Sequence, residues 1–299
     1  MKTKLLPLLL PALLFCMTAA ADTAYQPFVL ASINDAGLEQ QTEATVDALI
    51  GAGFTIAGQY SPLDNANVII VTSPELQDIA AKSDKGGYGA GERVSITERE
   101  GKTEVAFVNP LYIQYAYRLE GDMQGIYDQM SETLGNVETF GAKKQMTAKK
   151  LGKYHYKPLM PYFDDPYELG SFDSHEAATA AVESGLAAEG DALTLVYRID
   201  IPGKDQTVFG VGMKATSDDE DDIDEEHQLA IVDFESYSKV AYYPYEILVD
   251  GTEVEALHMK FRMAVHFPDL SMMGKHGFTS LMSSPGATED AFEELVEAE

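Results

Sequence analysis

The sequence predicts an α+β fold of two related domains, each an antiparallel sheet with helices packed on one face. Two hairpin patterns, in which apolar strands flank a short turn, occur at 94–108 and 245–267. Amphipathic helical segments lie beside these hairpins instead of alternating with single strands, which favours segregated helices over a parallel sheet. The order helix, strand, strand, hairpin, proline stop, helix also occurs twice, at low residue identity, which indicates an internal duplication.

The elements of the first half follow from hydrophobic periodicity and from residues that start or stop them. Apolar positions at helical spacing predict the first helix, and Ser73-Pro74 fits the cap and first turn of the second. Asn109-Pro110 ends the hairpin. The predicted elements are a strand at 28–32, a helix at about 38–52, strands at 54–59 and 68–71, a short helix to 81, hairpin arms at 94–99 and 104–108, and helices at 111–119 and about 122–134.

The second half repeats much of this order. Phe267-Pro268 stops its hairpin much as Asn109-Pro110 stops the earlier one. The predicted elements are a strand at 167–172, a helix from about 173 to 188, strands at 193–201, 207–213 and 228–234, hairpin arms at 245–249 and 253–267, and a final helix at about 288–296.

The N-terminus carries the pattern of a secretory signal. Lys2 and Lys4 precede an apolar stretch at 5–17, and the small residues 18–21 follow as a cleavage site. The stretch is shorter than the roughly 20 residues that a membrane-spanning helix needs. We therefore predict that residues 1–21 are removed and that the mature chain resides in the periplasm without membrane insertion.

Charge and cysteine content limit the partners. The formal charge of −28 repels nucleic acid and anionic membrane surfaces, which removes both as general partners. Cys16 is the only cysteine and lies in the predicted signal, so the mature chain is predicted to lack thiols and disulfides. The acidic run at 218–226 is typical of a solvated loop, with Ca²⁺ binding as an alternative that lacks EF-hand spacing.

We predict one domain at 22–141 and a second at 167–299, joined by a lysine-rich linker at 142–166. The linker stands out because six positive charges gather in an acidic chain. They are Lys143, Lys144, Lys149, Lys150, Lys153 and Lys157. Either these lysines pair with acidic surfaces of both domains, or they form a docking patch for an acidic partner.

Several segments of the first half resemble one known family. They are residues 46–56, the strand at 68–71, the helix start at 73–76 and the hairpin that ends in Asn109-Pro110-Leu111-Tyr112. These are similar to domain-of-unknown-function family 302, whose hairpin typically ends in an Asn/Asp-Pro-x-Tyr pattern. The resemblance covers roughly residues 38–119 and implies a compact α+β domain, with no established catalytic residues to carry over. The second half would be a distant repeat.

Tyrosines in both halves suggest a ligand site between the repeats. The residues predicted to line a groove for a small ligand or protein segment are Tyr112, Tyr115, Tyr242 and Tyr243. If 257–267 is a strand, alternation places four basic side chains on one face, namely His258, Lys260, Arg262 and His266. That stripe would bind an anionic ligand, or would face the acidic surface of its own protein.

A C-terminal set of histidines and methionines offers a different site. Thioethers with imidazoles suit Cu(I), and His/Met pairs also hold haem iron. The candidates are His266, Met272, Met273, His276 and Met282. On the predicted strand, by contrast, Met259 and Met263 share a face with Phe261 and are typical of core packing.

No nucleophile, general base or cofactor motif is recognisable, so an enzyme is the less favoured class. The sequence predicts an exported ligand- or protein-binding module with no cofactor. The alternative is a periplasmic protein that handles copper or haem through the C-terminal His/Met set.

Overall fold

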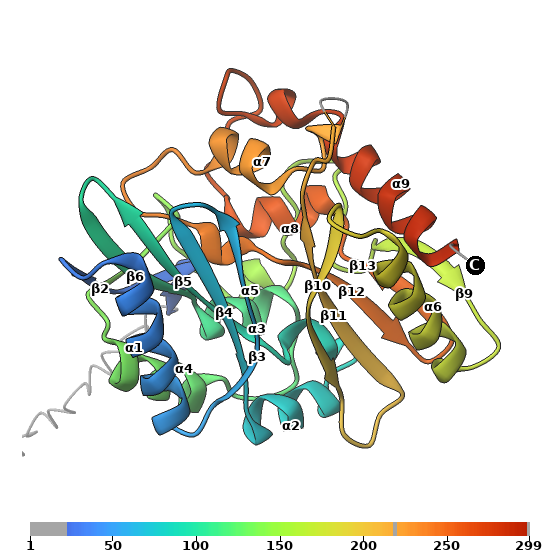
Figure 1. The fold of residues 1–299 in the computed structure, drawn as a ribbon, viewed down its shortest axis with the longest axis horizontal. Helices are drawn as coiled ribbons and strands as arrows, with labels where there is room; N and C mark the ends of the chain where they lie inside the picture. The colour runs from blue at the N-terminus through green and yellow to red at the C-terminus, as the bar shows by residue number, and fades with distance from the viewer. Residues whose placement is uncertain (1–22, 218–219, 298–299) are drawn as a thin grey trace, which may run out of the picture.

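The computed structural model describes residues 23–217 and 220–297 (Figure 1). The predicted signal peptide at 1–21, with Cys16, lies outside the described residues, and so do residues 218–219 of the acidic run. Within the described part of the chain, no helix is both long and apolar enough to cross a bilayer.

The first half forms a six-stranded antiparallel sheet in the order β3-β4-β5-β6-β2-β7. Its strands are β2 (Phe28–Asn34), β3 (Thr55–Leu63), β4 (Ala66–Thr72), β5 (Glu92–Arg99), β6 (Lys102–Val108) and β7 (Glu138–Phe140). Its helices are α1 (Leu38–Gly51), α2 (Pro74–Lys82), η1 (Gly86–Gly89), α3 (Pro110–Ala116) and α4 (Gln124–Leu134). Helices α1 and α4 pack on each other and on this sheet.

The second half forms a five-stranded antiparallel sheet in the order β10-β11-β12-β13-β9. Its strands are β9 (Tyr167–Ser171), β10 (Leu193–Asp200), β11 (Gln206–Met213), β12 (Tyr245–Asp250) and β13 (Glu253–Ala256). Its helices are α6 (His175–Ala188), α7 (Glu225–Val232), η3 (Val240–Tyr242), α8 (Met259–His266), η4 (Phe278–Leu281) and α9 (Ser284–Glu297). Helices α6 and α9 pack on each other and on this sheet, so the predicted α+β class is confirmed.

Local sequence explains where many of these elements begin. Ser73 caps α2 by accepting a hydrogen bond from the Leu76 amide at 3.2 Å, and Pro74 occupies the first helical turn. Glu100 and Gly101 have positive φ values of 52° and 74°, so β5 turns into β6 within two residues. Because these signals act over a few residues, the corresponding boundaries are predictable from sequence.

Two predicted strands are wrong. The segment predicted as strand 228–234 belongs mostly to α7, which Asp224 caps by accepting from the His227 amide at 2.8 Å. The predicted arm 253–267 ends as a strand at Ala256 and continues as α8, where His258 Nδ1 accepts from the Lys260 amide at 3.2 Å. Both helices have eight residues, and a short apolar run of that length fits either period.

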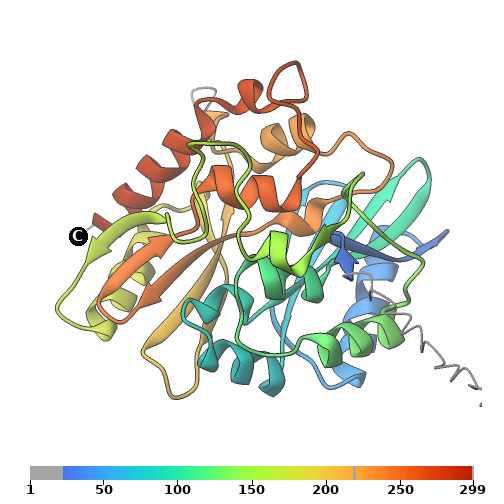
Figure 2. The ribbon, with the colours of Figure 1, turned by 180° about the vertical axis from the view of Figure 1, so that it is seen from behind.

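The predicted linker contains regular structure. Strand β8 (Met146–Thr147) pairs antiparallel with β1 (Ala24–Tyr25) at the start of the described chain. The short helix α5 (Ala148–Leu151) packs against α3, as the view from behind shows (Figure 2). The domain boundaries at 22–141, 142–166 and 167–299 stay predictions.

The two halves follow the same order of elements, and their sheets have the same strand order. Strands β3, β4, β5, β6 and β2 correspond in order to β10, β11, β12, β13 and β9. The halves also interlock, because η1 contacts β11 and β12 while η3, at the equivalent place, contacts β4, β5 and β6. The Gly87 amide donates to Oε1 of Gln206 at 2.8 Å across this boundary. The polar groups between the two sheets therefore come from both halves.

Candidate functional site

The two sheets meet where the edge strands β3 and β10 run against each other. Gly58 makes this approach possible, because a Cβ atom there would lie 2.9 Å from Cβ of Tyr197 and 3.0 Å from the carbonyl carbon of Val196. Figure 1 shows β3 and β10 side by side below α7. At one end of this junction the strands leave a pocket of about 610 Å³.

The pocket is formed by four segments that are far apart in the sequence. They are the end of β3 with its turn, the start of β10, the end of β11, and the start of α7. The lining residues include five acids and one lysine, namely Asp64, Asp191, Asp224, Glu225, Glu226 and Lys214. Asp64, Asp191 and Glu226 are exposed, and Asp224 is held by the amides of His227 and Ala215 at 2.8 and 2.9 Å. The pocket therefore has a strongly negative potential.

Glu225 differs from the other four acids because it is buried. It is 2% exposed, and its carboxylate accepts from the Tyr60 hydroxyl at 3.1 and 3.2 Å. Burial raises the pKa of Glu225 to about 8, against the opposing effects of the Met213 amide, the Tyr60 hydroxyl and Arg262. Glu225 is consequently protonated for the most part at neutral pH, and a positive charge nearby would favour its ionisation.

A buried network of charged groups lies deeper between the sheets. Glu246 of β12 accepts from Nη1 of Arg93 at 2.8 Å and from Nε of Arg262 at 3.2 Å. Arg93 comes from β5 in the first half, so this network joins the halves. Nη2 of Arg93 also lies 3.2 Å from Nε2 of His266. Burial and the two guanidinium groups hold the pKa of His266 well below its usual value, so its imidazole is neutral.

The structure places the four predicted groove tyrosines inside the protein or against its own chain. Tyr112, Tyr242 and Tyr243 are fully buried, and the Tyr112 hydroxyl donates to the Val265 carbonyl at 2.7 Å. The half-buried Tyr115 packs on Tyr25 with ring centroids 5.3 Å apart. These tyrosines stabilise the contact between segments, and none of them lines the acidic pocket.

The predicted basic stripe does not form, because 259–266 is helical. Arg262 and His266 are four residues apart on α8 and both are fully buried in the network around Glu246. His258 caps the helix instead, and burial followed by the charge of Lys260 lowers the pKa of His258 to about 4. The predicted stripe depends on strand alternation, which does not apply in a helix.

The residues proposed for copper or haem differ in exposure, and both histidines are engaged with backbone carbonyl groups. Met272, Met273 and Met282 are 38%, 76% and 72% exposed, whereas His266 is buried. Nδ1 of His276 lies 2.9 Å from the Ile231 carbonyl oxygen. Within residues 23–217 and 220–297, no group of three or more His, Cys, Asp or Glu side chains has an arrangement that could hold a metal ion.

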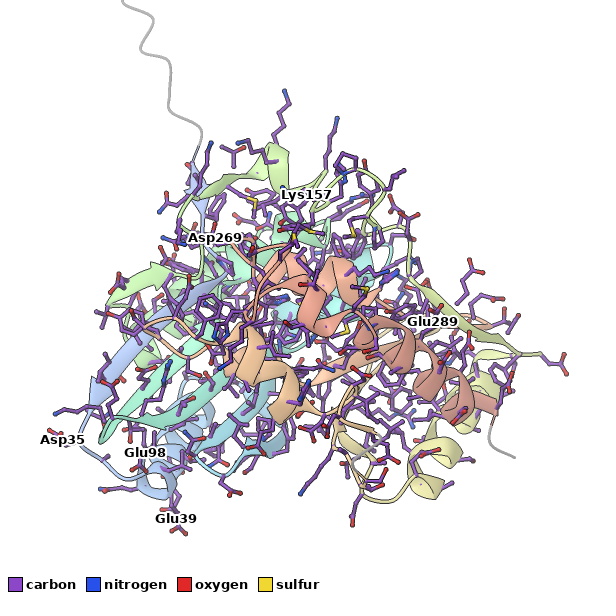
Figure 3. The ribbon with its side chains drawn as sticks, turned by 90° about the horizontal axis from the view of Figure 1, so that it is seen from above. Asp35, Glu39, Glu98, Lys157, Asp269 and Glu289 are labelled. Carbon is purple, nitrogen blue, oxygen red and sulfur yellow. The ribbon has the colours of Figure 1, made fainter. Side chains whose placement is uncertain are left out.

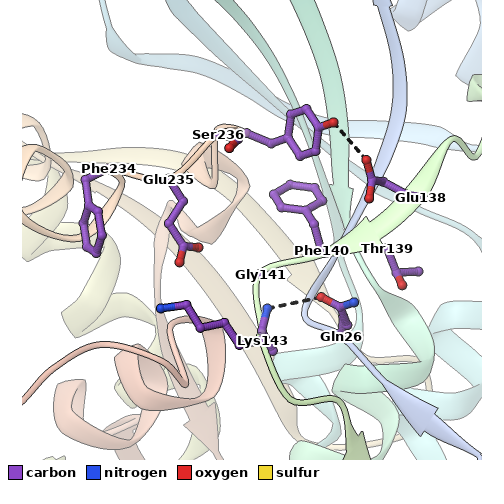
Figure 4. A pocket seen from close by; sticks show the side chains of 11 residues that line it. Gln26, Glu138, Thr139, Phe140, Gly141, Lys143, Phe234, Glu235 and Ser236 are labelled. Carbon is purple, nitrogen blue, oxygen red and sulfur yellow. Dashed lines mark hydrogen bonds between the residues drawn. The ribbon is translucent and has the colours of Figure 1, made fainter.

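A second pocket of about 440 Å³ lies between β7 and the loop 234–237 (Figure 4). Its walls are tied together by the Tyr237 hydroxyl, which donates to Oε1 of Glu138 at 2.9 Å. Phe140 packs on Tyr237 with ring centroids 5.4 Å apart. We favour the acidic pocket as the functional site, because it is larger and contains a buried carboxyl group with a strongly raised pKa.

Sequence reasoning missed the pocket residues, above all Glu225 and Tyr60. Glu225 belongs to the acidic run that the sequence predicts to be a solvated loop, whereas the structure places it buried at the start of α7. The available signal was Asp224 as an N-cap residue followed by Glu225 and Glu226, because acidic residues are enriched in the first turn of a helix. A carboxyl group in the first turn of such a helix is a candidate for burial.

The raised pKa values predict how stability changes with pH. Burial raises the pKa of Glu92 and of Glu225 from 4.5 to about 8, so the folded chain keeps two protons that the unfolded chain releases. The contribution of these two carboxyl groups to stability should therefore fall as pH rises from 4.5 towards 8 and level off above that. The lowered pKa values of His258 and His266 oppose this only below about pH 6.5, the pKa of histidine in the unfolded chain.

We expect the free energy of unfolding to drop by about 2–4 kcal/mol between about pH 6.5 and 8.5. Urea unfolding of the wild type and of the double variant E92Q/E225Q at both pH values measures this. The double variant should lose most of that dependence, whereas the exposed pair E39Q/E132Q should behave as the wild type. If the free energy of unfolding changed equally with pH in all three proteins, the raised pKa values of Glu92 and Glu225 would be contradicted.

Comparison with known proteins gives no match to this chain among family models, curated proteins or solved structures.

Proposed function

We propose that this chain is a binding protein, and that the acidic pocket binds an extended organic cation such as a polyamine. The observation that carries the proposal is the pocket itself, in which five carboxyl groups and one lysine line about 610 Å³ at the junction of the halves. That volume is in the range of small-molecule sites and exceeds what a bare ion fills. The proposal keeps the ligand-binding module expected from the sequence and specifies its ligand class.

The remaining lining residues fit an ammonium group on an alkyl chain. Tyr60 is half-buried, so part of its ring faces the pocket and offers a cation–π contact. Pro62 and Leu63, both half-buried, supply apolar surface for methylene groups. Carboxylates at the rim would pair with the charged ends, which gives affinity that depends on salt.

Glu225 would supply an additional negative charge when a cation binds. It is protonated for the most part at neutral pH, because burial raises its pKa to about 8. A cation bound beside it lowers that pKa, so binding at neutral pH should release a fraction of a proton. Affinity should consequently increase from about pH 6.5 to 8.5, and this dependence should vanish in the variant E225Q.

We also infer that the halves arose by duplication and that the protein acts in the periplasm after signal cleavage. Support for the duplication comes from equivalent positions that touch across the junction. Gly58 and Val196 are the fourth residues of β3 and β10, and Arg93 and Glu246 are the second residues of β5 and β12. The resemblance of residues 38–119 to domain-of-unknown-function family 302 stays a prediction.

Isothermal titration with spermidine, Mg²⁺ and glutamate tests the proposed ligand class. We expect saturable binding of spermidine alone, weakened by about 10- to 100-fold in the triple variant D64N/D191N/E226Q, because three attractive charges are lost. The control variant E39Q/E43Q/E132Q removes three exposed acids of α1 and α4 and should bind as the wild type. Equal affinities of both triple variants would overturn the proposal, and so would tighter binding of glutamate.

A further inference from the structure

The lysine segment, defined here as residues 142–162, differs from the rest of the molecule in its charge. No acidic residue occurs between Glu138 and Asp164, although 49 of the 299 residues are acidic. All six of its lysines are exposed. Among residues 23–217 and 220–297, no ion pair involves any of them, so the expectation that they pair with acidic surfaces of their own protein is not met.

The same segment also contains exposed apolar side chains. Leu159 is 104% exposed and has a positive φ of 71°, a backbone conformation that is unfavourable for leucine. Three residues further along the chain, Tyr162 is 40% exposed, and Nζ of Lys157 lies 5.2 Å from the ring centroid of Tyr156. An exposed leucine in one segment with tyrosines and lysines is the composition of segments that lie at a membrane surface.

The segment also lies where the N-terminal chain joins the fold. Strand β1 begins at Ala24, two residues after the undescribed N-terminal part, and pairs with β8 inside the lysine segment. Figure 3 shows Lys157 on a different side of the molecule from the acidic residues Asp35, Glu39 and Glu98.

We propose that the lysine segment is a peripheral membrane-binding surface that contacts anionic phospholipid headgroups, with Leu159 inserted among them. The formal charge of −28 does not prevent this, because charges separated by more than about 8 Å are largely screened at physiological ionic strength. Two acidic side chains near the segment already have partners within the protein. Asp164 pairs with Arg118, and Asp269 accepts from the amide of Lys143. The lysines are therefore left to an external anion.

Sedimentation with vesicles tests the proposal, using the exported protein with its N-terminus determined by mass spectrometry. We expect binding to vesicles of phosphatidylglycerol and phosphatidylethanolamine at about 0.15 M salt, and little binding to phosphatidylcholine alone. The variant K149Q/K150Q should bind about 10- to 30-fold more weakly, and Leu159→Ser about tenfold more weakly.

Two control variants test whether vesicle binding depends on this surface or on any exposed lysine or apolar residue. The variant K82Q/K102Q removes two exposed lysines elsewhere, and Ile50→Ser changes a residue of α1 that is 54% exposed. Both should bind as the wild type. If K82Q/K102Q lost as much vesicle binding as K149Q/K150Q, the proposal would be overturned. So would an absence of vesicle binding in a protein that binds poly-glutamate through Lys149 and Lys150, because the partner would then be an acidic protein.

Discussion

Replacing Glu246 with alanine is expected to lower the free energy of unfolding by about 3–5 kcal/mol, because it breaks a buried charge network. Glu246 is 2% exposed and contacts Arg93 at 2.8 Å and Arg262 at 3.2 Å. Without its carboxylate, two buried guanidinium groups lose their common partner and repel each other. Since Arg93 belongs to the first half and Glu246 to the second, the loss should also loosen the junction.

Urea unfolding followed by circular dichroism measures this effect, with Asp35→Ala as the control. Asp35 pairs with Lys102 at the surface, where the two side chains are 80% and 54% exposed, so its loss should cost less than about 1 kcal/mol. The triple variant R93M/E246M/R262M removes all three charges and tests whether the network stabilises the fold or only avoids unpaired charge. It should be more stable than Glu246→Ala. A cost for Glu246→Ala no larger than that for Asp35→Ala would contradict the network.

Gly58→Ala should lower the free energy of unfolding by about 3 kcal/mol or more, because the new methyl group has no room. Its Cβ would lie 3.0 Å from the carbonyl carbon of Val196 and nearer still to that carbonyl oxygen, and backbone cannot move aside as a side chain can. The substitution would force β3 away from β10. Because the acidic pocket lies at this junction, spermidine binding should weaken as well.

Two other glycines serve as controls for this prediction. Gly51 at the end of α1 has no atom within 4 Å of an added Cβ, so Gly51→Ala should be neutral or slightly stabilising. In Gly185→Ala the Cβ would lie 2.8 Å from the carbonyl carbon of Leu295, between α6 and α9. That variant should be destabilised yet keep its spermidine affinity. Loss of stability without any change in binding for Gly58→Ala would contradict the placement of the pocket.

Local signals explain why the fold class was predictable. Ser73 and Asn109 each cap a helix whose first residue is proline, and the turn at Glu100 and Gly101 fixes a hairpin. Each signal involves neighbouring residues and needs no knowledge of tertiary contacts. The order helix, strand, strand, hairpin is predicted in both halves and agrees with the structure. The predicted proline stop of the second half is wrong: Asn109-Pro110 directly follows β6, whereas Phe267-Pro268 follows α8, because β13 already ends at Ala256.

The wrong elements were those whose identity depends on tertiary packing. Helices α7 and α8 contain eight residues each, which is too short for periodicity to distinguish a helix from a strand. In α8 the error had a chemical consequence. It placed Arg262 and His266 on a solvent-facing stripe, whereas both are fully buried around Glu246.

The candidate site was not predictable from the sequence because its residues are brought together only by the meeting of the two sheets. Tyr60 and Glu225 are separated by 165 positions and form one hydrogen-bonded pair. The net charge of the sequence predicts the sign of the protein's electrostatic field but not where on the surface the charges gather. The structure places carboxyl groups around one pocket and six lysines on one segment, so a net charge of −28 conceals two surfaces of opposite sign.

Amide NMR spectra recorded during a spermidine titration test the central claim most directly, because they locate the ligand. We expect saturable shifts confined to the pocket walls, with Ala215 and Thr216 among the largest, since Asp224 and Glu220 accept hydrogen bonds from these two amides. Shifts centred on residues 138–143 and 234–237 would place the ligand in the other pocket. That result, or a titration that moves no amide of the acidic pocket, would contradict the proposed function.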